Sequence, residues 1–218
     1  MTTQSLPYRT YLMACDTDAS KLYDRTRTAF LVNAAALTEL VLSGLAADDH
    51  GFARVTGTEP AGDPVLDGLL TEMAAHRRSW KAWLRHHYRQ TLDITEHELA
   101  AAGTITLASR RLGGRRTVTV ADNAAVTTLQ AQVAAVLGGE PAAGLADPGL
   151  AALGLLAATG AVRPVLRARS PRGGPVSSRG GCIGELATRL DTAASPLGQR
   201  IRGLRMVMVA AQGGMGGS

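Results

Sequence analysis

The sequence contains few cysteines and few aromatic residues. Its two cysteines, Cys15 and Cys182, are far apart and form neither a CxxC motif nor a zinc-binding spacing. This excludes a disulfide framework and a zinc-finger fold, and it fits a reducing compartment. Aromatic residues make up only 4% of the chain. The core must therefore be built mainly from alanine, leucine and valine, a composition that favours packed helices over a β-sandwich.

Long apolar runs are also missing. The runs 150–162 and 206–211 are shorter than the roughly 20 residues of a transmembrane helix, and the apolar stretch 30–47 is interrupted by polar residues. The apolar run near the N-terminus, 11–14, is too short for a secretory signal. We therefore expect no membrane span and a cytoplasmic location.

The sequence lacks the common catalytic motifs, namely GxSxG, GxxxxGK[ST], HExxH and a GxGxxG that follows a strand. We therefore favour a non-enzymatic role without a cofactor. Arginine, in contrast, is abundant: the 218 residues carry a net charge of +5, and Lys21 and Lys81 are the only lysines. In a chain so rich in arginine, only clusters of cations indicate a binding partner.

Hydrophobic periodicity predicts a mainly α-helical protein. Phe30, Ala34, Leu37 and Val41 repeat at helical spacing before Gly44, and the segment 26–42 is apolar on nearly all sides, as expected for a central helix. We expect a single globular domain around this helix, with a core over about 6–210 and a flexible tail over 211–218. Further helices are predicted over residues 64–76, 79–102 with a break near Asp93, 122–137, 147–162, 183–190 and 197–211.

The segment 103–120 predicts a protruding β-hairpin. Ile105 and Leu107 alternate with polar residues, as do Val118 and Val120, and a pair of glycines separates the two runs. A smaller hairpin is predicted over 45–55, with its turn in the sequence DDHG. The tip of the first hairpin is basic, and we expect it to contact a membrane through Arg110, Arg111, Leu112, Arg115 and Arg116.

A second group of cations precedes this hairpin. Lys81, Arg85 and Arg89 recur every four residues, so a continuous helix would place them on one stripe. Each such cation near an anionic leaflet contributes about 1 kcal/mol, which makes the hairpin and the stripe suitable for weak, reversible attraction. The solvated face of a helix has the same pattern, and this alternative stays open.

Two other features have a chemical and a structural interpretation. His86 and His87 are adjacent, but no third ligand follows at a usable spacing, so we predict no metal site. Cys182 stands at a predicted helix start, where the helix dipole lowers a thiol pKa and favours reactivity. A small, partly buried side chain explains the same position.

The order of motifs resembles a known family. The segments AAALTELVLSGLAADDHGFARV, GDPVLDGLL, a helix that contains WL, AAGTITL with its hairpin, ADNAAVTTLQAQVAAVLGG and DPGLAALGLLAATGAVRPVL resemble the actinobacterial branch of the Golgi phosphoprotein 3 family. This resemblance implies a single, mainly α-helical domain with a protruding hairpin. Eukaryotic members are peripheral membrane proteins that bind phosphatidylinositol 4-phosphate in a basic pocket and recruit glycosyltransferases and a myosin.

The resemblance also suggests where a headgroup would bind. The family pocket uses a Trp and an Arg near the first core helix and an Arg-x-x-Arg pair before the hairpin. In this sequence Arg89 matches the first Arg of the pair, whereas Leu92 and Asn33 occupy the two other Arg positions. Tyr23 is the aromatic residue nearest to the Trp position. We therefore expect phosphate or headgroup contacts from Tyr23, Lys81, Arg85 and Arg89.

These observations favour a non-enzymatic, peripheral binding module at an anionic phospholipid surface. A client protein is a further partner that the resemblance allows, whereas no specific nucleic-acid partner is expected, because no reading helix or stacking platform is evident. The alternative is an enzyme that acts on a prenyl or other lipid diphosphate, like a terpene cyclase. Its magnesium would need the acidic pairs Asp16/Asp18 or Asp48/Asp49, which also fit ordinary turns.

Overall fold

The computed structural model describes residues 5–57, 59–108, 116–140, 146–168, 179–194 and 201. In this part of the chain the fold is mainly α-helical, and each sheet is a small antiparallel pair of strands. The predicted fold class is therefore confirmed. The predicted helix 197–211, except for Ile201, and the predicted tail 211–218 lie outside the described residues.

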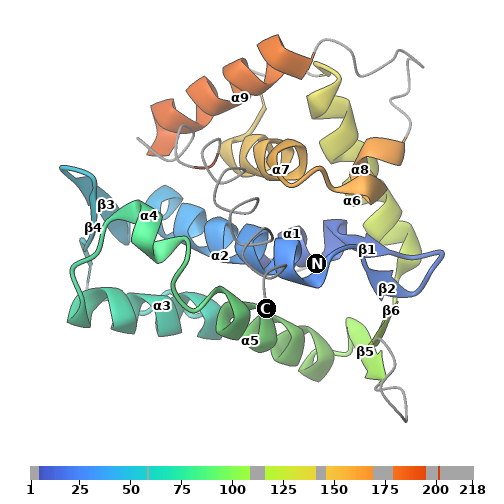
Figure 1. Cartoon of the computed structure of the whole chain (residues 1–218), viewed down its shortest axis with the longest axis horizontal. Coiled ribbons are helices and arrows are strands. Elements are labelled where there is room, and N and C mark those ends of the chain that lie inside the picture. The colour runs from blue at the N-terminus through green and yellow to red at the C-terminus, as the bar shows by residue number, and fades with distance from the viewer. Residues whose placement is uncertain are drawn as a thin grey trace, which may run out of the picture.

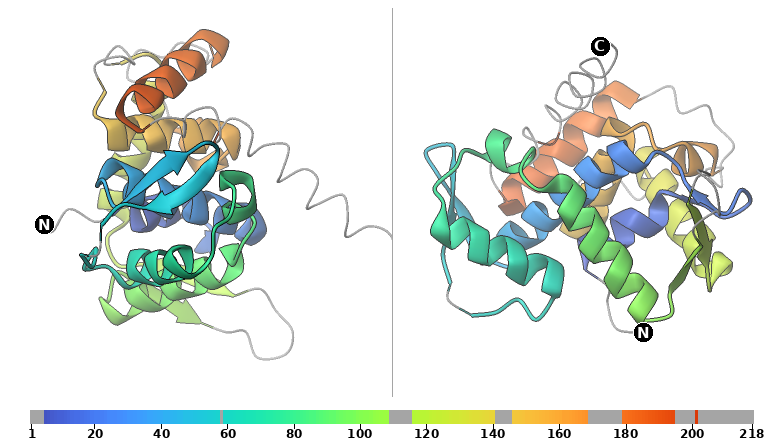
Figure 2. Two further views of the ribbon diagram at one scale, coloured as in Figure 1. Left: turned by 90° about the vertical axis from the view of Figure 1, so that its left-hand side faces the viewer. Right: turned by 60° about the horizontal axis from the view of Figure 1, so that its bottom comes forward.

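Helix α2 (Arg25–Leu42) forms the centre of the fold, as predicted from its apolar pattern. It begins where the Asp24 side chain accepts a hydrogen bond from the Arg27 amide, and most of its residues are buried. Figure 1 shows α1 (Leu6–Met13) beside it in a middle layer. Helices α3 (Pro64–Ala75) and α5 (Tyr88–Ala101) lie on one side of this layer, and α7 (Pro148–Thr159) lies on the other, as the left view of Figure 2 also shows.

The remaining helices surround this arrangement. Helix α9 (Arg179–Ala194) packs on the outer side of α7, α6 (Asn123–Leu137) crosses the end of the bundle, and α8 (Arg163–Arg167) contacts both α6 and α7. Aspartates also begin three other helices of the described residues, because Asp63, Asp122 and Asp147 each accept hydrogen bonds from backbone amides of the first turn. These starts agree with the predicted ones.

Within the part of the chain that the structure describes, three hairpins project from the helices. Strands β1 (Cys15–Asp16) and β2 (Lys21–Leu22) form the smallest. Strands β3 (Ala46–Asp49) and β4 (Phe52–Val55) form the second, with His50 and Gly51 both at positive φ in its turn. Strands β5 (Ile105–Ala108) and β6 (Thr117–Val120) form the predicted basic hairpin. Its turn, residues 109–115, lies outside the described residues.

The predicted helix 79–102 is instead two helices. Four residues separate the end of α4 (Trp80–Trp83) from the start of α5, and α5 continues through Asp93, where a break was expected. At this interruption the side-chain amide of Asn33, a residue of α2, donates to the carbonyl oxygens of Trp83 at 2.9 Å and His86 at 3.4 Å. His87 then adopts a left-handed conformation with φ of 50°. The prediction of a continuous stripe formed by Lys81, Arg85 and Arg89 is therefore wrong.

Candidate functional site

Three exposed cations lie in the turn between α4 and α5 and on the two helices that flank it. Lys81 lies on α4, Arg85 lies in the turn, and Arg89 lies in the first turn of α5. None of them forms an ion pair with a carboxylate of the described residues. The Arg89 guanidinium lies 5.6 Å from the centre of the Tyr88 ring, which leaves its charge unneutralised. We call Lys81, Arg85 and Arg89 the turn cations, and their charges are available to an external anion.

Tyr23, the fourth residue expected at a headgroup, is only partly exposed and lies just before the start of α2. The guanidinium above its ring belongs to Arg163 on α8, at 5.8 Å from the ring centre. An exposed arginine of α8 thus accompanies Tyr23, and the sequence pattern did not point to it.

Two positions that the resemblance aligns with headgroup arginines are internal. Asn33 is 0% exposed, and besides its two carbonyl contacts its side-chain oxygen accepts a hydrogen bond from the Thr91 hydroxyl at 3.1 Å. Leu92 is 1% exposed. Neither side chain can therefore contact a headgroup in solvent, and Arg89 is the only one of the three aligned positions that presents a charge outside.

The base of the basic hairpin is tied to α5 by an ion-pair network. Arg116 donates to Oε2 of Glu96 at 2.7 Å, and Oε1 of Glu96 accepts from Arg25 and, at 3.0 Å, from the Tyr11 hydroxyl. Arg25 also pairs with Asp93 at 2.6 Å. Glu96 is buried, whereas the two arginine side chains are about half exposed. Arg116 is thus partly neutralised at the point where the hairpin leaves the body of the protein.

This network changes the ionisation of its members. Burial lowers the pKa of Arg25, but the hydrogen bond and charge of Glu96 and the charge of Asp93 outweigh burial and raise it. Burial and the Glu96 carboxylate both raise the pKa of Tyr11. The network therefore keeps Arg25 charged and Tyr11 neutral. The other residues expected at the membrane, Arg110, Arg111, Leu112 and Arg115, lie outside the described residues, and their role stays a prediction.

The comparison with protein families agrees with this architecture. The family model for Golgi phosphoprotein 3 (GPP34) matches residues 6–194. The chain belongs to the Golgi phosphoprotein 3 family. No curated protein matches it.

This Golgi phosphoprotein 3 family member has a cavity of about 510 Å³ between α1, α3 and the ends of α2 and α5. Its polar lining includes the carboxylates of Glu39, Asp63 and Glu98. The Asp63 carboxylate accepts hydrogen bonds from the hydroxyl of Ser5 at 2.6 Å and from the hydroxyl of Tyr8 at 3.2 Å. An anionic headgroup would be repelled by this lining, so the cavity does not fit a phospholipid phosphate.

The acidic pairs serve turns in this family member. Asp48 accepts from the Gly51 amide and, at 2.6 Å, from the Trp80 ring nitrogen, while Asp49 pairs with Arg77. Asp16 accepts from the Ala19 amide at 3.0 Å. The two pairs therefore do not converge on a common cavity. They give no support to a magnesium-diphosphate site.

The pKa values of both cysteine thiols of the family member are raised. Burial, and then the charge of Glu96, raise the pKa of Cys15 to about 12. Burial and the charge of Glu185 raise the pKa of Cys182, against an opposing hydrogen bond from the backbone of Gly139. Of the two interpretations of Cys182, the raised pKa disfavours a reactive thiol and agrees with a small, partly buried side chain. Its thiol instead donates to the Val136 carbonyl at 3.2 Å.

We expect both thiols of the native protein to react with a disulfide reagent such as Ellman's reagent at least about tenfold more slowly than the same thiols of the unfolded chain. The reason is that little thiolate is present in the native protein. The single variants Cys15→Ser and Cys182→Ser assign each rate, and the rate in guanidinium chloride is the control. A native thiol that reacts as fast as the unfolded one would contradict the raised pKa values.

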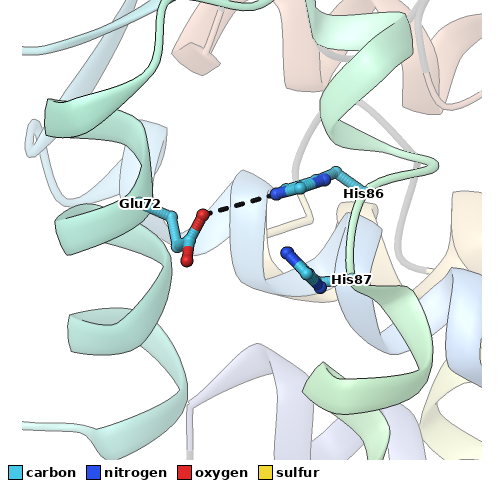
Figure 3. Close-up of side chains that lie close together, drawn as sticks. All are labelled: Glu72, His86 and His87. Carbon is cyan, nitrogen blue, oxygen red and sulfur yellow. Dashed lines mark hydrogen bonds and ion pairs between the residues drawn. The ribbon is translucent and has the colours of Figure 1, made fainter.

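A histidine pair and a carboxylate meet beside the turn cations. His86 and His87 are contributed by the turn, and Glu72 comes from α3, with its carboxylate oxygen 3.4 Å from Nε2 of His86 (Figure 3). Burial lowers the pKa of His86, while the hydrogen bond to Glu72 opposes this and the charges of His87 and Arg78 reinforce it. Glu72 was not expected beside the histidines, because it lies on a different helix, 14 residues before His86.

Proposed function

We propose that this protein is a peripheral binding module that contacts anionic phospholipid headgroups through the turn cations. The observation that carries the proposal is the presence of three exposed cations within one turn and its flanks, without an ion-pair partner among the described residues. Membership of the Golgi phosphoprotein 3 family supports a binding module. No helix of the described residues is long and apolar enough to cross a membrane.

The expected attraction is weak and reversible. Each cation contributes about 1 kcal/mol near an anionic leaflet, so the turn cations together supply about 3 kcal/mol, which salt screens within a Debye length. Stable residence on a membrane takes two such signals. We propose that the basic hairpin tip, with Arg110, Arg111 and Arg115, is the second contact, and that Arg116 acts mainly to anchor the hairpin base.

The proposed contact depends on charge and not on a headgroup pocket. Two of the three aligned arginine positions hold the buried residues Asn33 and Leu92, which leaves Arg89 without the partners that would enclose a phosphoinositide. Lys81 and Arg85 supply charge next to Arg89 but come from a separate helix and a turn. We therefore expect binding to any anionic phospholipid, in proportion to its charge density.

Co-sedimentation with vesicles tests this proposal. We expect the wild type to pellet with phosphatidylcholine vesicles that contain phosphatidylglycerol and not with pure phosphatidylcholine. The double variant Lys81→Ala/Arg85→Ala should lower the partition coefficient about thirtyfold, because two contributions of about 1 kcal/mol are lost. Added salt should weaken the binding of the wild type in the same assay.

The matched control is Arg54→Ala/Arg167→Ala, which removes the same net charge. Arg54 on β4 and Arg167 on α8 are exposed and, among the described residues, have no ion-pair partner. We expect this control to retain most of its binding, since the charges lie on other elements. Equal losses in the two double variants would mean that only net charge matters, and the assignment to the turn cations would then be wrong.

A further inference from the structure

Three side chains with metal-binding chemistry face one another between α3 and the turn that follows α4. One carboxylate oxygen of Glu72 and one ring nitrogen each of His86 and His87 all lie within 4.8 Å of one another. The two imidazole rings have centres 3.7 Å apart and planes at 63°. In Figure 3 both rings point from the turn toward the carboxylate on the neighbouring helix.

The local backbone builds this arrangement. In a continuous helix, successive side chains point about 100° apart, so His86 and His87 would diverge. Here the helix is interrupted, and His87 adopts a φ of 50°, a conformation that costs energy for a residue with a side chain. The interruption turns both rings to the same side. Such strain in a non-glycine residue is concentrated at functional sites in proteins.

The set of donor atoms matches a particular class of ligand. Two imidazole nitrogens and one carboxylate oxygen are the ligands of three-residue zinc sites and suit related first-row divalent ions. Donors around one such ion are separated by roughly 3–4 Å, so rotations that move the side chains by about 1 Å close the cluster. His86 is mostly buried and His87 is exposed, which gives an ion both a fixed ligand and a path from solvent.

The charges next to the cluster set a limit on its affinity. The positive charge of Arg78 acts on His86 and opposes a bound cation. The Arg78 guanidinium lies over the Trp83 ring, at 5.5 Å from its centre, and the negative charge of Glu72, which faces the two histidines in Figure 3, partly offsets the charge of Arg78. A site with three protein ligands leaves a fourth position for water or an external anion.

We propose that Glu72, His86 and His87 form a binding site for one divalent transition-metal ion of the Zn²⁺ type. None of the turn cations is a ligand of this site, and the proposal does not depend on phospholipid binding. Glu72 and the two imidazoles hold the ion, and the hydrogen bond between Glu72 and His86 orders two of the ligands before the ion arrives.

Calorimetric titration of tag-free, chelator-treated protein with ZnCl₂ tests the proposal, and Co²⁺ supplies a second readout through its visible absorption. We expect one Zn²⁺ per chain for the wild type and a Co²⁺ spectrum typical of a site with nitrogen and oxygen ligands. The variants His86→Ala, His87→Ala and Glu72→Gln should each bind at least about tenfold more weakly. Glu72→Gln keeps a hydrogen-bond acceptor for His86, so circular dichroism of this variant should match the wild type.

His97→Ala is the control, because His97 is an exposed residue of α5 outside the cluster. We expect it to bind as the wild type does. The proposal is overturned if the wild type shows no saturable binding, if Glu72→Gln and His87→Ala bind as tightly as the wild type, or if His97→Ala loses as much affinity as they do.

Discussion

Replacement of Glu96 by alanine is expected to lower the free energy of unfolding by about 3 kcal/mol. The Glu96 side chain is 2% exposed and accepts hydrogen bonds from Tyr11, Arg25 and Arg116, which come from α1, α2 and the base of the hairpin. Its loss leaves the buried Tyr11 hydroxyl without its partner. The two arginines are 43% and 47% exposed, so water compensates part of their loss and keeps the effect below that of a fully buried pair.

Asp93→Ala provides the matched control for this prediction. Asp93 lies on the same helix and pairs with the same Arg25, but its side chain is 64% exposed. We therefore expect a loss below about 1 kcal/mol. Urea unfolding followed by circular dichroism measures both variants. If Glu96→Ala and Asp93→Ala lose the same free energy, burial of Glu96 contributes nothing and the stabilising role of the network is wrong.

The parts of the fold that could be predicted are those with local causes. The pairs Asp63-Pro64 and Asp147-Pro148 each combine a capping carboxylate with a residue suited to the first helical position, and both helices begin there. The apolar pattern of α2 also predicted its burial. In contrast, α1 was not expected, because its eight residues, which include Pro7 and Arg9, have no amphipathic pattern and are helical mainly through their packing on α2.

The parts that could not be predicted depend on contacts between distant residues. The segment 79–102 has the local signals of one helix, and the contact that interrupts it comes from Asn33, some fifty positions earlier in the sequence. Similarly, Arg116 was read as a free cation because nothing near it in the sequence shows that Glu96 is buried beside it. The three turn cations are exposed, but the single helical stripe that their four-residue spacing predicted is absent, because they lie on two helices and the turn between them.

Replacement of Asn33 by alanine is expected to lower the free energy of unfolding by about 2 kcal/mol and to weaken Zn²⁺ binding at His86 and His87. Asn33 is fully buried and joins α2 to the Trp83 and His86 carbonyls and to Thr91. Without its amide, the Trp83 carbonyl loses its side-chain partner in the interior. The turn then loses the contacts that hold His86 next to His87, so the donor atoms spread apart.

Thr38→Val separates this effect from that of any polar residue buried in α2. Thr38 is as buried as Asn33, but its hydroxyl donates to the Ala34 carbonyl of its own helix at 2.8 Å. Since valine keeps the shape and the helix keeps its own hydrogen bonds, we expect a change below about 1 kcal/mol and unaltered Zn²⁺ binding. Denaturant unfolding and zinc titration of both variants measure the two quantities. If Asn33→Ala bound Zn²⁺ as the wild type does while losing stability, Asn33 would support the core without shaping the turn, and the geometry of the histidine pair would have to arise from the left-handed His87 alone.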